Sequence, residues 1–173
     1  MPEEVSPGAS AALRARTGPA HEAVDTAYGA YRLDDRESYT AFLIAHARAL
    51  PAVEAWLAGR SLDFPWRSRR EALAADLMTL GEAFPEPLPF DLPDDNAAHW
   101  GALYVTEGSR LGGVMLARQV GEGLPRAYLE SGFGAGEWRR FRDALDEAAA
   151  DAAWIDRAVA AAEQVFALYG RAA

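Results

Sequence analysis

The segment from Gly101 to Val120 (GALYVTEGSRLGGVMLARQV) is a long apolar stretch with glycines at positions 108, 112 and 113. Glycine inside a helix costs roughly 1 kcal/mol relative to alanine, but the flanking leucines and methionine still favour helix. Gly108 and Gly112 are four residues apart, so they share one face of the predicted helix. That face lacks side chains over two successive turns, and another helix, a backbone turn or a planar ligand can therefore lie directly on the backbone.

The rest of the 173-residue chain also favours helices, because alanine is abundant and β-branched residues are few. Ser10, Asp34 or Asp35, Ser68, and Asp94 or Asp95 are the expected N-caps of the first four helices. Apolar periodicity predicts two more helices, from about 136 and from about 152 to 169, with an irregular link over 124–135. We predict an all-α, single-domain bundle of about six to eight helices over 10–173, preceded by a flexible arm over 1–9.

Composition excludes several classes of function. The net charge of −9 argues against a basic nucleic-acid surface, and the absence of cysteine excludes disulfides, thiolate nucleophiles and Cys-ligated metals. The first ten residues are acidic and do not resemble a secretory signal. Apolar runs also fall short of the ~18 to 20 residues that span a bilayer. We therefore expect a cytoplasmic protein with no nucleic-acid or membrane partner.

The chain has three histidines, His21, His46 and His99. None is spaced from another as in a helical zinc site, but one histidine suffices as an axial haem ligand. His21 is the best candidate, because it lies on the apolar stripe of the first helix and Asp25, one turn later, can orient its ring. A buried structural histidine is the alternative. His46 is expected to be a packed residue of the core or its boundary, and His99 to lie near the exposed start of the glycine-bearing helix.

Arginines lie on the polar sides of two predicted helices. Arg14 is on the first helix, and Arg139, Arg140 and Arg142 are on the fifth. They are either an ordinary solvated surface or partners for carboxylates, whose geometry the guanidinium group matches. Together with His21 and the glycines, they describe a flat, dianionic, metal-bearing ligand such as haem.

Two motifs resemble one known family. LRARTGPAHEAVD, with Thr17 four residues before His21, resembles the proximal helix of haem oxygenases, and GALYVTEGSRLGG resembles their distal helix. The resemblance covers nearly the whole chain and is closest to the short bacterial type found with bacteriophytochromes. It implies a helical fold in which haem is sandwiched between the proximal and distal helices.

The resemblance also implies residue roles. His21 would bind the iron with Asp25 as its partner, and Thr17 would lie beside the haem. Gly108 and Gly112 would cover the distal face, with Gly113 completing the bend. Arg14 and Arg142 would contact the propionates, with Arg139 as a second choice. Ser109 stands where many family members have an aspartate that anchors a proton-delivering water network, and a neutral hydroxyl is a weaker anchor.

The implied reaction is oxidative cleavage of haem b, as both substrate and prosthetic group, to biliverdin, carbon monoxide and ferrous iron. Dioxygen and external electrons, from a ferredoxin or a flavin reductase, would be required. A bacteriophytochrome would be a further partner that receives biliverdin. Two alternatives remain open: a carrier or sensor of the same fold that binds haem or a bilin without degrading it, which Ser109 suggests, and a helical interaction bundle without haem.

Overall fold

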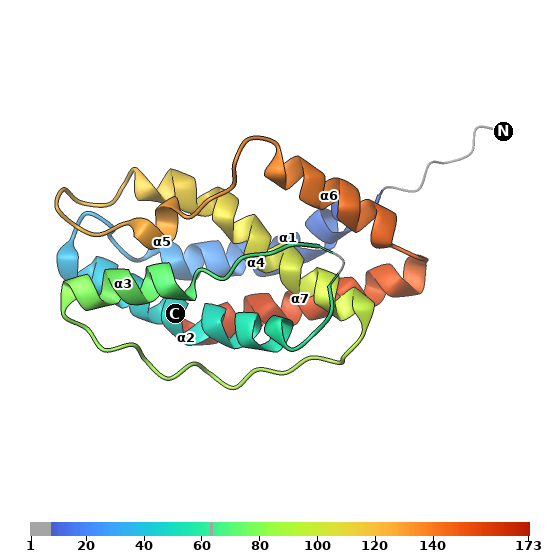
Figure 1. The fold of residues 1–173 in the computed structure, drawn as a ribbon, viewed down its shortest axis with the longest axis horizontal. Coiled ribbons are helices and arrows are strands. Elements are labelled where there is room, and N and C mark those ends of the chain that lie inside the picture. The colour runs from blue at the N-terminus through green and yellow to red at the C-terminus, as the bar shows by residue number, and fades with distance from the viewer. Residues whose placement is uncertain (1–7, 63) are drawn as a thin grey trace.

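The computed structural model describes residues 8–62 and 64–173. In these ranges the chain forms seven helices and no strand, which confirms the predicted all-α class and helix number (Figure 1). The helices are α1 (Ala9–Gly29), α2 (Arg36–Ala58), α3 (Arg70–Leu80), α4 (Asn96–Ala117), α5 (Ala127–Glu130), α6 (Glu137–Ala148) and α7 (Ala152–Ala172).

Helix α7 organises the core, because it packs along α4, α1 and α2. The closest approach is at Gly101 of α4, where a Cβ atom would lie only 2.2 Å from the carbonyl oxygen of Ala158 on α7. Only glycine allows the two backbones to come this close. Helices α1 and α4 run in the same direction, from right to left in Figure 1, and α6 packs against both.

Several helix starts follow from the local sequence. The side chains of Asp35, Asp95 and Asp151 accept backbone N–H groups of Ser38, Ala98 and Trp154, and so cap α2, α4 and α7. The first two were predicted as one member of an aspartate pair. These caps are readable from sequence because the acceptor and the donor are three residues apart.

The two serine caps were wrong. Helix α1 begins at Ala9, with Gly8 at the N-cap, and both the backbone N–H and the hydroxyl of Ser10 donate to Asp146 of α6 (2.7 and 3.0 Å). Arg69, not Ser68, holds the N-cap position of α3. The Ser68 hydroxyl donates to Glu54 at 2.5 Å and accepts the N–H of Arg70 at 3.1 Å, so it still satisfies one donor of the first turn. In both cases a carboxylate from another helix takes the serine as its partner.

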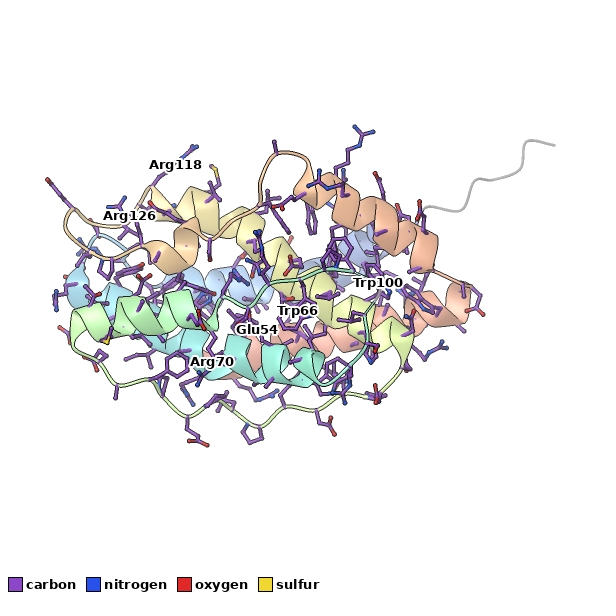
Figure 2. The ribbon with its side chains drawn as sticks, in the orientation of Figure 1. Glu54, Trp66, Arg70, Trp100, Arg118 and Arg126 are labelled. Carbon is purple, nitrogen blue, oxygen red and sulfur yellow. The ribbon has the colours of Figure 1, made fainter. Side chains whose placement is uncertain are left out.

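Two predicted boundaries also need correction. Helix α4 ends at Ala117, although the predicted segment ran to Val120, and Arg126 donates to the carbonyls of Ala117 and Val120 at that end (Figure 2). The predicted irregular link over 124–135 contains α5. Its first turn is capped from a distance, because Asp76 on α3 accepts the N–H groups of Ala127 and Tyr128 at 3.1 and 2.9 Å.

The N-terminal arm was predicted over 1–9. Residues 1–7 lie outside the described residues, whereas Ala9 is buried and belongs to α1. The domain therefore begins before residue 10, and the division into an arm and one domain stays a prediction.

Helix α2 is long and apolar enough to cross a membrane by length and composition alone, and it is the one such helix in the described ranges. In its most apolar window 61% of the residues are buried in the fold, as in the core helix of a bundle. The proline-rich connector after α3 runs outside this helix, and Leu88 donates its N–H to the carbonyl of Arg48 at 2.8 Å.

Candidate active site

The candidate proximal helix α1 and the candidate distal helix α4 approach each other at Thr17 and Tyr104. Burial raises the pKa of Tyr104, and the nearby Thr17 hydroxyl and the charge of Arg14 oppose this effect. The Thr17 hydroxyl itself donates to the Leu13 carbonyl within α1 at 2.8 Å. Because α1 and α4 run in the same direction (Figure 1), His21 and Gly108 each lie one helical turn beyond Thr17 and Tyr104. The structure thus places the two motifs that were singled out in the sequence on neighbouring helices.

The His21 imidazole is accessible, with 59% of its side chain exposed. Its Nε2 atom is 3.5 Å from Asp25 Oδ1, and the ring packs against Phe166 of α7 at a centroid distance of 5.5 Å. The arrangement differs from the alternative of a buried, hydrogen-bonded core histidine. An exposed imidazole backed by an aromatic ring can bind a metal ion carried by a ligand.

The C-terminal half of α4 presents exposed apolar surface. Leu111, Val114 and Met115 are among the four large hydrophobic residues that are exposed in the described chain. A Cβ atom at Gly112 would have no atom within 4 Å, so the backbone is open there. Exposed apolar side chains around a bare stretch of backbone indicate a surface that a hydrophobic ligand covers.

The other glycines of this helix have different surroundings. A Cβ atom at Gly108 would lie 3.5 Å from Cη2 of Trp138 on α6. At Gly113 it would lie 3.0 Å from the carbonyl oxygen of Leu129 on α5. The glycine at 113 is therefore explained by close packing of α4 on α5, and the glycines at 108 and 112 remain candidates for facing a ligand.

The candidate propionate ligands lie where α1 meets α6. The Ser10–Asp146 contact joins these helices, with Arg14 one turn after Ser10 and Arg142 one turn before Asp146. Arg14 and Arg142 are exposed and make no ion pair within the described residues. Arg139 is also exposed, and its Nε lies 3.9 Å from Asp143.

Sequence reasoning missed the partner of Ser109. The side chain of Arg69, which is 4% exposed, donates from Nη2 to Ser109 Oγ at 2.6 Å and to the Thr106 carbonyl at 2.9 Å. Ser109 in turn donates to the same carbonyl at 2.8 Å. The Nε of Arg69 is buried without a protein partner. A buried cation thus stands directly behind Ser109.

Four buried charged side chains surround this position. Glu54 on α2 accepts the backbone N–H of Arg69 at 2.9 Å, and Arg110 donates from Nε to both carboxylate oxygens of Glu107 at 3.1 Å (Glu54 is labelled in Figure 2). Burial raises the pKa of Glu107, and Arg110 opposes the rise. Two arginines and two glutamates balance in charge, as buried ions require.

The two remaining histidines are structural. His46 is half-buried at the boundary of the core, within the predicted range, with Nδ1 2.7 Å from the Tyr128 hydroxyl, and burial together with the charge of Arg69 lowers its pKa to about 3. His99 was expected near an exposed helix start, but it is buried, with Nε2 2.8 Å from Asp94 Oδ1. This hydrogen bond lowers the pKa of Asp94. His46 belongs to α2 and His99 to α4, so neither is part of the candidate site on α1.

No model of a known protein family matches the chain. A haem oxygenase from Xanthomonas campestris pv. campestris (strain 8004) is 35% identical to it over 144 residues, which cover 77% of this chain and 87% of the relative. The chain belongs to the haem oxygenase family. Membership confirms the predicted family, the enzyme class, haem-degrading activity and haem as the ligand.

Two solved haem oxygenases share the fold. The NO- and CO-bound enzyme from Neisseria meningitidis superposes with a TM-score of 0.77 at 24% identity, covering 95% of this chain and 89% of that chain. The enzyme from Leptospira interrogans gives 0.74 at 20% identity, covering 96% and 98%. Both likenesses confirm the haem oxygenase-like helical bundle.

Proposed function

We propose that the chain holds haem b between α1 and α4 and cleaves it to biliverdin, carbon monoxide and ferrous iron. The observation that carries the proposal is the pairing of an exposed His21 imidazole on α1 with an open apolar stretch of α4 around Gly112. Bound haem supplies the oxygen and redox chemistry, and the protein supplies binding, orientation and a route for protons.

On the proximal side, His21 would be the iron ligand. Asp25, whose Oδ1 lies 3.5 Å from Nε2 of His21, would hydrogen bond the ring nitrogen that does not bind the iron and so fix the ring. Thr17 closes this side through its contact with Tyr104. Phe166 behind the ring provides a firm apolar backing.

On the distal side, the backbone at Gly108 and Gly112 would face the haem. The absence of side chains at these two positions would let an apolar ring approach the helix and leave room for dioxygen. Leu111 and Met115 lose exposed apolar surface to the ligand. Gly113 contributes indirectly, because its contact with Leu129 fixes the helix against α5.

The propionates extend toward the α1–α6 junction. Arg14 and Arg142 are the proposed partners, and Arg139 is the weaker second choice because Asp143 is close to it. Guanidinium groups bind carboxylates through paired hydrogen bonds. Each exposed pair of this kind is worth about 1 kcal/mol or less, so the arginines orient the haem more than they hold it.

Ser109 anchors water for proton delivery. A serine hydroxyl has one donor and two acceptor sites. Its donor is used on the Thr106 carbonyl and one acceptor site receives Arg69, so one acceptor site remains for water. The fixed positive charge of Arg69 compensates for the missing carboxylate by ordering the hydroxyl. This geometry favours turnover over the carrier alternative.

Electrons come from outside the chain, because a protein without cysteine cannot hold a Cys-ligated iron–sulfur cluster. A ferredoxin or a flavin reductase is the proposed donor, the cytoplasm the proposed location, and a bacteriophytochrome the proposed recipient of biliverdin. Support for the recipient is the resemblance to the short bacterial type.

The test is to add hemin, a reductant and oxygen to the purified protein. The proposal predicts loss of the Soret band with appearance of biliverdin absorbance and release of one carbon monoxide per haem. A stable haem complex under these conditions would instead establish the carrier. Failure to bind hemin would leave only the helical interaction bundle.

A further inference from the structure

The two glycines that share one face of α4 are not equivalent. At Gly112 a Cβ atom would meet nothing within 4 Å, whereas at Gly108 it would lie 3.5 Å from Cη2 and 4.0 Å from Cζ3 of Trp138. The edge of an indole ring therefore lies within van der Waals reach of a methyl group at position 108, at one end of the bare face. A planar ligand that slides along α4 from Gly112 toward Gly108 meets this ring.

Trp138 is held firmly in place. Its ring stacks on Phe141 at a centroid distance of 5.4 Å and an angle of 17°, and it also contacts Phe133 and Tyr104 at 5.9 and 6.2 Å. Phe141 is fully buried and packs in turn against Trp100, which Figure 2 labels. Aromatic contacts of this kind add about 0.5 to 1.5 kcal/mol each beyond the area they bury.

The turn that precedes Trp138 is fixed as well. Gly136 has a positive φ of 76°, and Glu137 accepts the N–H of Gly134. Arg67, in the segment between α2 and α3, lies 3.6 Å from Glu137. Helix α6 and the segment between α2 and α3 therefore both fix the position of the Trp138 indole.

We propose that Trp138 is a positioning residue that stops the haem along α4 and so selects the meso carbon that is cleaved. The inference rests on the proposed function, since it requires haem beneath this helix. The four meso carbons lie around the porphyrin edge, and the orientation of the ring in its own plane would decide which of them faces the distal helix. A fixed indole beside Gly108 would limit that orientation at one end of the bare face, whereas Gly112 leaves the other end open.

The test compares Trp138→Phe and Trp138→Ala with wild type and with Trp154→Phe as a matched control. Trp154 is a buried tryptophan on α7 whose Nε1 donates to Asn96 at 3.0 Å, outside the proposed site. Biliverdin from each protein is separated by isomer. The cyanide-inhibited haem complex is examined by proton NMR, which reports the in-plane position of the haem without turnover.

Wild type and Trp154→Phe are each expected to give a single biliverdin isomer. In wild type, a nuclear Overhauser effect is expected between protons of the Trp138 ring and of the haem edge. Trp138→Ala is expected to make a second isomer at least several-fold more abundant than in wild type, with altered haem methyl shifts. Trp138→Phe is expected to change the isomer ratio and the methyl shifts less, in the same direction. It replaces the alanine variant in the test if that variant is unstable.

The same single isomer and the same methyl shifts in both Trp138 variants would overturn the inference, as would an isomer mixture from wild type. Failure of wild type to bind hemin is a different result, since it removes the proposed function itself. The two failures are therefore distinguishable in one set of experiments.

Discussion

Arg69 and Ser109 are joined by a hydrogen bond of 2.6 Å from Nη2 to Oγ, although they belong to segments 40 residues apart. The guanidinium is buried, and it supplies a fixed positive charge at the distal helix. A serine at this position is therefore not an isolated hydroxyl. It is one part of a charged arrangement that also includes Glu54, Glu107 and Arg110.

Substitutions at Ser109 test this arrangement. Ser109→Ala removes the water acceptor and one partner of Arg69, so we expect turnover to fall about tenfold or more, in the range of a lost general acid–base contact. Hemin affinity should change less than threefold. Ser109→Asp pairs with Arg69 and keeps free lone pairs for water, so it should retain turnover within a few-fold of wild type. Single-turnover spectroscopy measures both, and wild-type rates in Ser109→Ala would contradict the proposed role.

Arg69 also carries a stability prediction. Arg69→Met removes one member of a buried charged set, and the expected loss is about 3 to 5 kcal/mol in the free energy of unfolding. Arg70 is the matched control, because it is exposed and contacts the Phe84 ring at 4.7 Å. Arg70→Met should cost less than about 1 kcal/mol. Urea titration compares the two, and equal losses would show that burial of Arg69 has no special energetic role.

Two glycines of α4 should respond oppositely to alanine. Gly101→Ala places a methyl group 2.2 Å from the Ala158 carbonyl, so we expect a loss of about 3 kcal/mol from forced separation of α4 and α7. Gly112→Ala meets no atom and should stabilise the haem-free protein by up to about 1 kcal/mol. The added methyl faces the proposed ligand, so hemin affinity should fall. Thermal unfolding and hemin titration check the pair, and unchanged affinity in Gly112→Ala would argue against a ligand on this face.

His46 predicts a pH dependence of stability. Its pKa falls from 6.5 to about 3 in the folded protein, so the unfolded chain binds a proton that the folded chain excludes as pH drops below 6.5. Stability should decrease with falling pH through this window by about 1.4 kcal/mol per pH unit, or about 2 kcal/mol between pH 6.5 and 5. His46→Gln should lack this slope. Denaturant titrations at a series of pH values compare wild type with His46→Gln. The same dependence of the unfolding free energy on pH in both proteins would refute the prediction.

Much of the fold could be predicted because its signals are local. The caps at Asp35 and Asp95 involve partners three residues away, and Gly81 ends α3 with a positive φ of 85°. Helix α5 escaped prediction because Asp76, 51 and 52 residues distant, supplies its cap. Its four residues are also too few to show a helical period.

The residues of the candidate site also divide into those with a local sequence signal and those placed by long-range contacts. His21 and the glycines at 108 and 112 were identified because each motif is continuous in sequence. Arg69 was missed because its partners lie on α2 and α4, and no spacing along the chain reveals a contact over 40 residues. Trp138 was not singled out from the sequence, since its approach to Gly108 depends on how α6 crosses α4.

Hemin titration of His21→Ala is the most direct test of haem held by α1 beneath α4. His99→Gln is the control, because His99 is buried beside Asp94 and lies outside the site. We predict that wild type and His99→Gln give the sharp Soret band of histidine-ligated haem. His21→Ala should lose that spectrum and regain it on addition of imidazole. A wild-type Soret spectrum in His21→Ala without imidazole would contradict the account.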